Sequence, residues 1–121
     1  MSGETRYVFT AAMDVDPAKE ELFNEVYDTE HIPLLLKVPG VISVTRYVKE
    51  PFEMVIGGES RQMLNPSEPK HAAVYEIEDP GVLTSAAWAE AVDQGRWPTE
   101  VRPYTSNRRH TLHKERRAHN G

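Results

Sequence analysis

The chain has 121 residues, of which 39% are hydrophobic and 27% charged, and this length and composition predict one domain (residues 1–121) with a modest core. It contains no cysteine, which excludes disulfides, thiolate metal ligands and a cysteine nucleophile. The net charge of −5 is unevenly spread: residues 106–121 hold five basic residues and one acidic, a balance of +4, so the remainder carries −9. The acidic body argues against nucleic acid as a partner.

The chain contains no apolar run long enough to span a membrane, so we expect no membrane partner. Its first ten residues lack a basic region followed by an apolar block, the pattern of a signal peptide. A cytoplasmic location is therefore expected.

The first predicted elements are a strand and a helix. Residues 6–15 have apolar side chains on both alternating faces, which predicts a strand buried on both sides. Asp16 then suits a helix N-cap and Pro17 the first helical position. The helix that follows is predicted to be amphipathic, because four apolar residues fall at helical spacing. They are Leu22, Phe23, Val26 and Tyr27.

Pro33 interrupts this helical pattern, because proline lacks an N–H group and clashes with the preceding turn. We expect a kink over residues 29–32 and then a second, short helical piece in "IPLLLKV", ended by the Pro-Gly turn at residues 39–40. His31 would then lie beside a break in the helix, where its side chain can be directed into a cleft.

Residues 41–50 alternate as a second strand, which places Arg46 and Tyr47 on opposite faces. Residues 51–69 contain a Gly-Gly pair and three prolines, and they are interpreted as an excursion, either a loop or a hairpin over "FEMVI" and "SRQML". Residues 71–78 predict the third strand.

Asp79 and Pro80 are typical of a helix start, and a helix is expected over about residues 80–94, with Gly95 ending it. A final strand is expected at residues 105–113. The basic tail, residues 114–121, is expected to be frayed and solvated, although such a tail could also serve an interaction module.

The order of these elements predicts an α+β fold, the ferredoxin-like split βαβ arrangement, with an antiparallel sheet covered by helices on one face. Strands that are apolar on both sides indicate that the other face is also buried. A homodimer that packs sheet against sheet is the economical way to bury it.

Two stretches resemble a known family. "FNEVYDTEHIPLLLKVPGVISVTRY" (residues 23–47) and "LTSAAWAEAVDQGRWPTEVRPYTSNRRH" (residues 83–110) resemble the dimeric α/β-barrel superfamily, and within it the EthD-like group of bacterial proteins. The superfamily includes cofactor-independent monooxygenases, isomerases, polyketide cyclases, haem proteins and stress-response proteins, so the resemblance names no single reaction. It implies a dimer with a ligand pocket between the sheet and the helices of each protomer.

The resemblance places Tyr27 and His31 in that pocket, together with Arg46 or Tyr47. A strand sends these two side chains to opposite faces, so both cannot line the same pocket directly. We prefer Tyr47, which lies on the face of Ser43 and Thr45. His31 is the candidate acid–base group, since an ordinary histidine pKa of ~6.5 suits proton transfer near neutrality, and Tyr27 lies four residues earlier on the same face. The alternative is that His31 only caps the broken helix.

Trp97 and Phe9 are further candidates for the pocket wall, with core packing as their alternative role. Arg102, Asn107 and Arg109 could hold an anionic group or simply be solvated. We expect no metal, because His110 and His113 have a spacing that a strand sends to opposite faces. No phosphate-binding loop and no serine-hydrolase motif occurs.

The function expected from these observations is a cofactor-independent enzyme of lyase, isomerase or oxygenase type, acting on a small aromatic or polyketide-like molecule. The alternative is a non-catalytic, small-molecule-binding or stress-associated homodimer.

Overall fold

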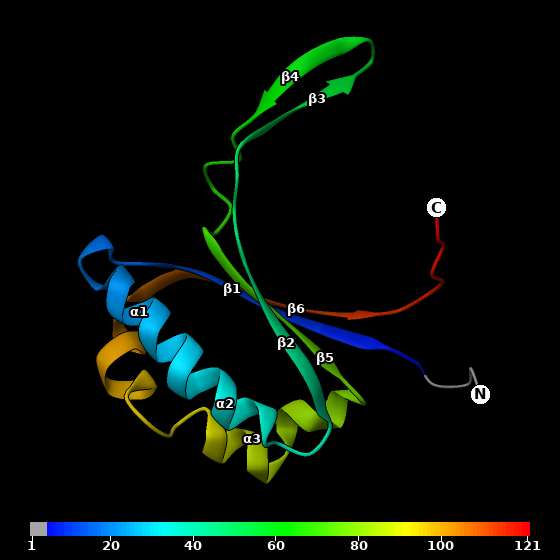
Figure 1. Ribbon diagram of the computed structural model, residues 1–121. Helices are drawn as coiled ribbons and strands as arrows, with labels where there is room; N and C mark the ends of the chain where they lie inside the picture. Colours follow the sequence, from blue (N-terminus) through cyan, green and yellow to red (C-terminus); the bar gives the residue numbers. More distant parts are fainter. Residues whose placement is uncertain (1–4) are drawn as a thin grey trace.

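The computed structural model describes residues 5–121 and contains a four-stranded antiparallel sheet with helices on one face (Figure 1). The strand order is β2-β5-β1-β6, and each neighbouring pair is antiparallel. The strands are β1 (Tyr7–Val15), β2 (Val41–Val48), β5 (His71–Ile77) and β6 (Thr105–Lys114). This order confirms the ferredoxin-like split βαβ fold predicted from the sequence.

The first helical segment comprises a 3₁₀ turn (Pro17–Lys19), α1 (Glu20–Val26), a π-helical turn (Tyr27–His31) and α2 (Ile32–Leu36). Asp16 caps its start, because its carboxylate accepts a hydrogen bond of 2.9 Å from the Ala18 N–H.

The predicted second helical piece is present as α2, and the irregularity expected before it takes the form of a π-helical turn through which the helix continues, not of a break. His31 and Ile32 keep helical dihedral angles, and the Ile32 N–H donates to the Tyr27 carbonyl oxygen five residues earlier. A π turn holds one residue more than an α turn, and this wider turn accommodates a proline that has no N–H to contribute. His31 therefore points inward from a continuous helix.

The second helical segment is less continuous than predicted. Pro80–Thr84 forms a 3₁₀ turn, and α3 spans only Ala86–Ala91. Ser85 separates them with extended backbone, and its hydroxyl caps the new helix by accepting from the Trp88 N–H at 3.2 Å. A second π-helical turn (Trp97–Val101) and a 3₁₀ turn (Arg102–Tyr104) then lead into β6.

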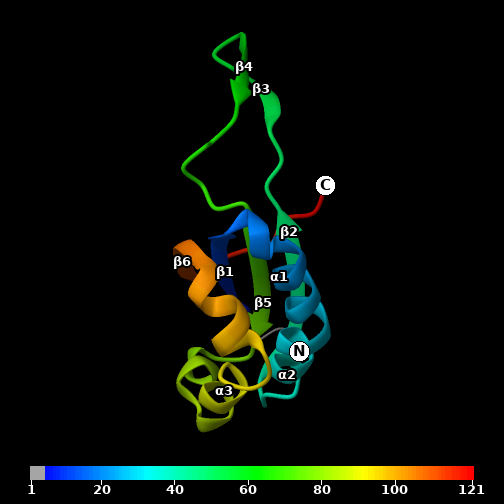
Figure 2. The ribbon, with the colours of Figure 1, turned by 90° about the vertical axis from the view of Figure 1, so that its left-hand side faces the viewer.

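The excursion between β2 and β5 contains a hairpin of β3 (Phe52–Ile56) and β4 (Glu59–Met63). Gly57 and Gly58 form its turn with φ angles of 61° and 83°, the positive values that a tight hairpin turn requires. The hairpin projects away from the four-stranded sheet and pairs with no strand of it (Figures 1 and 2).

The core lies between the helical layer and the sheet. Its fully buried side chains come from both layers: Tyr75, Phe23, Leu35, Ile77, Val26 and Val101. Within residues 5–121 no helix covers the opposite face of the sheet (Figure 2). No helix in this part of the chain combines the length and the apolarity needed to cross a lipid bilayer.

Candidate functional site

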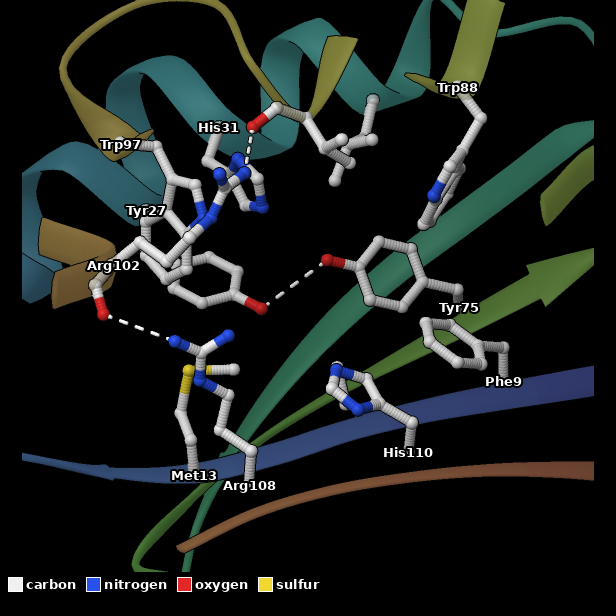
Figure 3. Close-up of a pocket in the computed structure, with 13 residues that line it drawn as sticks. Phe9, Met13, Tyr27, His31, Tyr75, Trp88, Trp97, Arg102, Arg108 and His110 are labelled. Carbon is white, nitrogen blue, oxygen red and sulfur yellow. Dashed lines mark hydrogen bonds between the residues drawn. The ribbon is translucent and has the colours of Figure 1, made fainter. Parts of the chain in front are cut away.

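A cavity of about 190 Å³ lies between the helix-covered face of the sheet and the helical layer (Figure 3). Strands β1, β5 and β6 form its floor, and the first π-helical turn, α3 and the second π-helical turn form its roof. Its aromatic wall consists of Phe9, Tyr27, Tyr75, Trp88 and Trp97. Its polar groups are His31, Arg102, Arg108 and His110, together with the two tyrosine hydroxyls. An apolar cavity with a few polar groups is the usual form of a small-molecule site.

His31 is 5% exposed and belongs to the first π-helical turn. Its imidazole stacks on the indole of Trp97, with ring centroids 4.3 Å apart and planes 18° from parallel. The ring of Tyr27 meets it edge-on, at a centroid distance of 5.2 Å. The Nδ1 atom of His31 is buried and has no hydrogen-bond partner within residues 5–121. A buried polar atom without a partner is unusual in a folded protein, and this nitrogen is free to form a hydrogen bond with a group that enters the cavity.

Burial lowers the pKa of His31 from 6.5 to about 4, and the nearby positive charge of Arg102 acts in the same direction. The imidazole is therefore neutral at neutral pH. In this form one ring nitrogen can accept a proton or a hydrogen bond while the other donates.

The hydroxyl oxygens of Tyr27 and Tyr75 lie 3.3 Å apart at the centre of the cavity (Figure 3). Burial raises the pKa of both phenols, so both remain protonated. Because a hydrogen bond between two phenols uses only one of the two hydroxyl protons, the other can be donated to a ligand.

Neither Tyr47 nor Arg46 lines the cavity, and of the two it is Arg46 that faces the helices. Tyr47 is 57% exposed and lies on the open face of the sheet, outside the cavity. Arg46 shares the helix-covered face, because its partner across the β2–β5 ladder is the buried Ala73. The sequence alternation of β2 does not reveal which of its two faces the helices cover.

Arg46 nevertheless does not line the cavity. Its guanidinium lies over the ring of Tyr27, 4.9 Å from the centroid. It also donates hydrogen bonds to Asn24 Oδ1 at 2.7 Å and Asp28 Oδ1 at 3.0 Å. Arg46 therefore joins β2 to the helix and holds Tyr27 in place.

Phe9 and Trp97 both line the cavity, as the sequence analysis anticipated. Phe9 lies 5.5 Å from the ring of Tyr75 and meets Trp88 edge-on at 5.9 Å. Edge-to-face and tilted contacts of this kind are the favoured geometries of aromatic side chains.

The position of Trp97 depends on an ion pair beside it. The Glu30 carboxylate accepts from the Arg96 backbone N–H at 2.9 Å and from its Nε at 2.6 Å. These bonds hold the pKa of Glu30 below its usual range. Since Glu30 precedes His31 and Arg96 precedes Trp97, the pair joins the two π-helical turns and fixes the stacked rings against each other.

Sequence reasoning did not assign Tyr75, Trp88, Arg108 or His110 to the site. The strand β6 changes its alternation at Asn107, which has a φ angle of 49° and lies where the β1–β6 register shifts. His110 then pairs with Ala11 and faces the cavity. Only the register of β6 against β1 could have revealed this.

Of the three residues considered for binding an anion, only Arg102 lines the cavity. Asn107 donates to Asp14 Oδ2 at 3.0 Å, and Arg109 pairs with Glu68 at 2.8 Å. No group of three His, Asp or Glu side chains arranged for a metal ion occurs within residues 5–121.

No protein-family model and no curated protein sequence matches the chain. Among solved structures, an EthD family protein from Bacillus halodurans is similar with a TM-score of 0.55 and 16% identity, covering 91% of this chain and 99% of that one. SnoaB, a cofactor-independent oxygenase from Streptomyces nogalater, is similar with a TM-score of 0.57 and 15% identity, covering 93% of this chain and 95% of that one. At these identities the likenesses show the fold alone, and it is the ferredoxin-like α+β fold that the sequence predicted.

Proposed function

We propose that the protein is a cofactor-independent enzyme that acts on a small aromatic or polyketide-like molecule in this cavity. The observation that carries the proposal is the buried, neutral His31, whose Nδ1 has no partner, in an aromatic cavity with two tyrosine hydroxyls. The fold likeness to SnoaB, a cofactor-independent oxygenase, supports the same class of chemistry.

In this scheme His31 accepts a proton from an acidic C–H or O–H group of the substrate. The Tyr27–Tyr75 pair donates a hydrogen bond to the oxygen on which negative charge develops, and it does so in a site largely shielded from water. The product of this step is an enolate or phenolate, from which isomerisation, elimination or reaction with dioxygen can follow. The aromatic wall holds the substrate ring by stacking and edge contacts.

The alternative is a non-catalytic ligand-binding or stress-associated homodimer that uses the same cavity. The low pKa of His31, about 4, favours this alternative, because such an imidazole is a weak base. Both functions predict ligand binding, and they differ in whether His31 is needed for turnover.

The test is His31→Gln, with binding and turnover of aromatic and polyketide-like compounds measured separately. Both tryptophans of the chain, Trp88 and Trp97, line the cavity, so intrinsic fluorescence reports directly on binding. Lost turnover with retained binding supports the enzyme, whereas a wild-type protein that binds without turnover supports the alternative. His119→Gln, in the exposed tail, is the matched control.

We also propose that two copies associate through the open face of the sheet. Side chains of β1 and β5 on this face, such as Val8, Ala12 and Val74, are only half-buried in the single chain. Light scattering coupled to gel filtration would give the mass in solution, and a monomer at all concentrations would reject this assembly. The cytoplasmic location stays a prediction.

A further inference from the structure

We propose that the ligand of this cavity is an aromatic anion, a carboxylate or phenolate with one or two rings, and that Arg108 binds its charged group. This inference rests on the proposed function, because both concern the same cavity. It adds the class of molecule that the cavity binds.

The charges around the cavity differ in sign from the net charge of the chain. The whole chain is acidic, with 19 Asp and Glu against 14 Lys and Arg. The cavity wall instead carries two positive charges, those of Arg102 and Arg108, and no acidic side chain, while His31 is neutral. A cleft lined by charges of one sign attracts a ligand of the opposite sign.

Arg108 differs from the other arginines in its pairing. Six other arginines of residues 5–114 form an ion pair with a carboxylate: Arg6, Arg46, Arg61, Arg96, Arg102 and Arg109. Arg108 has no such partner within the described residues, and its Nη2 donates to the Arg102 carbonyl oxygen at 3.3 Å. A guanidinium has five N–H donors in a planar fork, so Arg108 retains donors that match a carboxylate or a phenolate.

The side chain of Arg108 is directed toward the two tyrosine hydroxyls. Figure 3 shows Arg108 and His110 extending from β6 toward the hydroxyl groups of Tyr27 and Tyr75. An anionic group between them would accept hydrogen bonds from the guanidinium and from a tyrosine hydroxyl. Its ring would then lie among the aromatic side chains of the wall.

The size of the cavity limits the ring system. An apolar cavity of about 150 Å³ holds a benzene molecule, so about 190 Å³ accommodates one ring or two fused rings. Larger ring systems would have to extend out of the cavity.

The test compares 2-naphthoate with 2-naphthamide, which have the same rings and nearly the same size but differ in charge. Binding to the wild-type protein is measured by titration calorimetry, and we expect 2-naphthoate to bind at least about tenfold more tightly. In Arg108→Gln we expect this preference to disappear, while binding of the amide is unchanged. In Arg108→Lys part of the preference should remain, because the charge is kept and the fork is lost.

Arg61→Gln is the matched control, since it removes the same charge from the hairpin, which contributes nothing to the cavity wall. Circular dichroism and thermal unfolding of each variant establish that it is folded. Equal affinities of the acid and the amide for the wild-type protein, or binding of neither compound, would overturn the proposal. So would a preference that survives in a folded Arg108→Gln.

These binding measurements are independent of turnover, so the two proposals can fail separately. An anion preference without any His31-dependent turnover rejects the enzyme and keeps the ligand class. His31-dependent turnover of neutral compounds, without an anion preference, keeps the enzyme and rejects the ligand class.

Discussion

The imidazole of His31 stacks on the indole of Trp97 at 4.3 Å, although the two residues are far apart in the sequence and belong to different π-helical turns. The neighbouring pair Glu30–Arg96 joins the same two turns by a hydrogen-bonded ion pair of 2.6 Å. The Glu30–Arg96 ion pair and the His31–Trp97 ring stack therefore form one structural unit. A change in the ion pair is expected to disturb the ring stack.

Gly95→Ala is expected to disturb this unit. Gly95 has a φ angle of 70°, and an added Cβ would lie 2.7 Å from Glu30 Oε1. The left-handed backbone alone costs roughly 1–2 kcal/mol for a residue with a Cβ, and the contact displaces the carboxylate from Arg96. We expect a lower unfolding temperature and an altered tryptophan emission spectrum.

Gly58→Ala is its control, because Gly58 has a φ angle of 83° but no atom within 4 Å of the added Cβ. Its strain falls on the hairpin, so the tryptophan spectrum should match that of the wild type. A Gly95→Ala spectrum identical to the wild type would show that the ring stack does not depend on the ion pair.

His31 is expected to make stability depend on pH. Its pKa is lowered to about 4 in the folded protein, so as the pH falls the unfolded chain binds the proton first. The contribution of His31 to the free energy of unfolding is therefore fully present above the unfolded pKa of 6.5, and it is lost as the pH falls toward about 4. At 1.36 kcal/mol per pKa unit, the total decrease is about 3 kcal/mol.

Urea unfolding of the wild type and His31→Gln at about pH 7.5 and about pH 4.5 measures this contribution. Between about pH 7.5 and about pH 4.5, the free energy of unfolding of the wild type should fall by about 2–3 kcal/mol more than that of the variant. His119→Gln, in the exposed tail, should behave as the wild type does. Parallel pH profiles for wild type and His31→Gln would contradict the assignment.

The hydroxyls of Tyr27 and Tyr75 are expected to be energetically coupled, because they lie 3.3 Å apart in a buried site. Each single change to phenylalanine leaves the other hydroxyl without this partner and should cost roughly 1 kcal/mol. The double variant should cost less than the sum, since it leaves no unpaired hydroxyl. Chemical denaturation of the four proteins gives the coupling, and strictly additive costs would mean that the two groups do not interact.

Arg46 and Tyr47 are neighbours in sequence with opposite expected effects. Arg46→Ala removes the guanidinium over Tyr27 and two hydrogen bonds to the first helix, one of them to an exposed carboxylate, and should cost roughly 1–2 kcal/mol. Tyr47→Ala should change the stability of the single chain by no more than about 0.5 kcal/mol, since its side chain is exposed.

Thermal and urea unfolding of both variants at low protein concentration provides the comparison. A concentration-dependent loss of stability in Tyr47→Ala would support association through the open sheet face. Equal effects of the two substitutions at low concentration would contradict the placement of Arg46.

Replacing residues 52–63 with two glycines is expected to leave the domain folded. The hairpin strands pair only with each other in the described part of the chain, and none of their residues lines the cavity. Lys49 remains to close the base of the excursion, through a backbone bond of 2.8 Å to Lys70. Far-UV circular dichroism and 2-naphthoate titration should match those of the full chain, and loss of ligand binding would reveal a role for the hairpin in the site.

The sequence by itself determined the local features of this protein. Asp16 and Pro17 specify a helix start, and Gly57 and Gly58 specify a hairpin turn, because each depends on the dihedral angles and hydrogen bonds of a few adjacent residues. The order of strands and helices also allowed few topologies, and the ferredoxin-like sheet is one of them. His31, Tyr27, Trp97 and Phe9 were named as candidates because of a family resemblance and their residue types, and all four line the cavity.

Only the tertiary structure decided which faces meet. The π-helical turn carries the helix past Pro33, and the packed helices determine that Arg46, not Tyr47, faces them. The register shift beside Asn107 places Arg108 and His110 in the cavity. The alternation of side chains along a strand divides them between two faces but does not show which face the helices cover. Which residues reach the cavity therefore depends on pairing and packing between segments that are distant in the sequence.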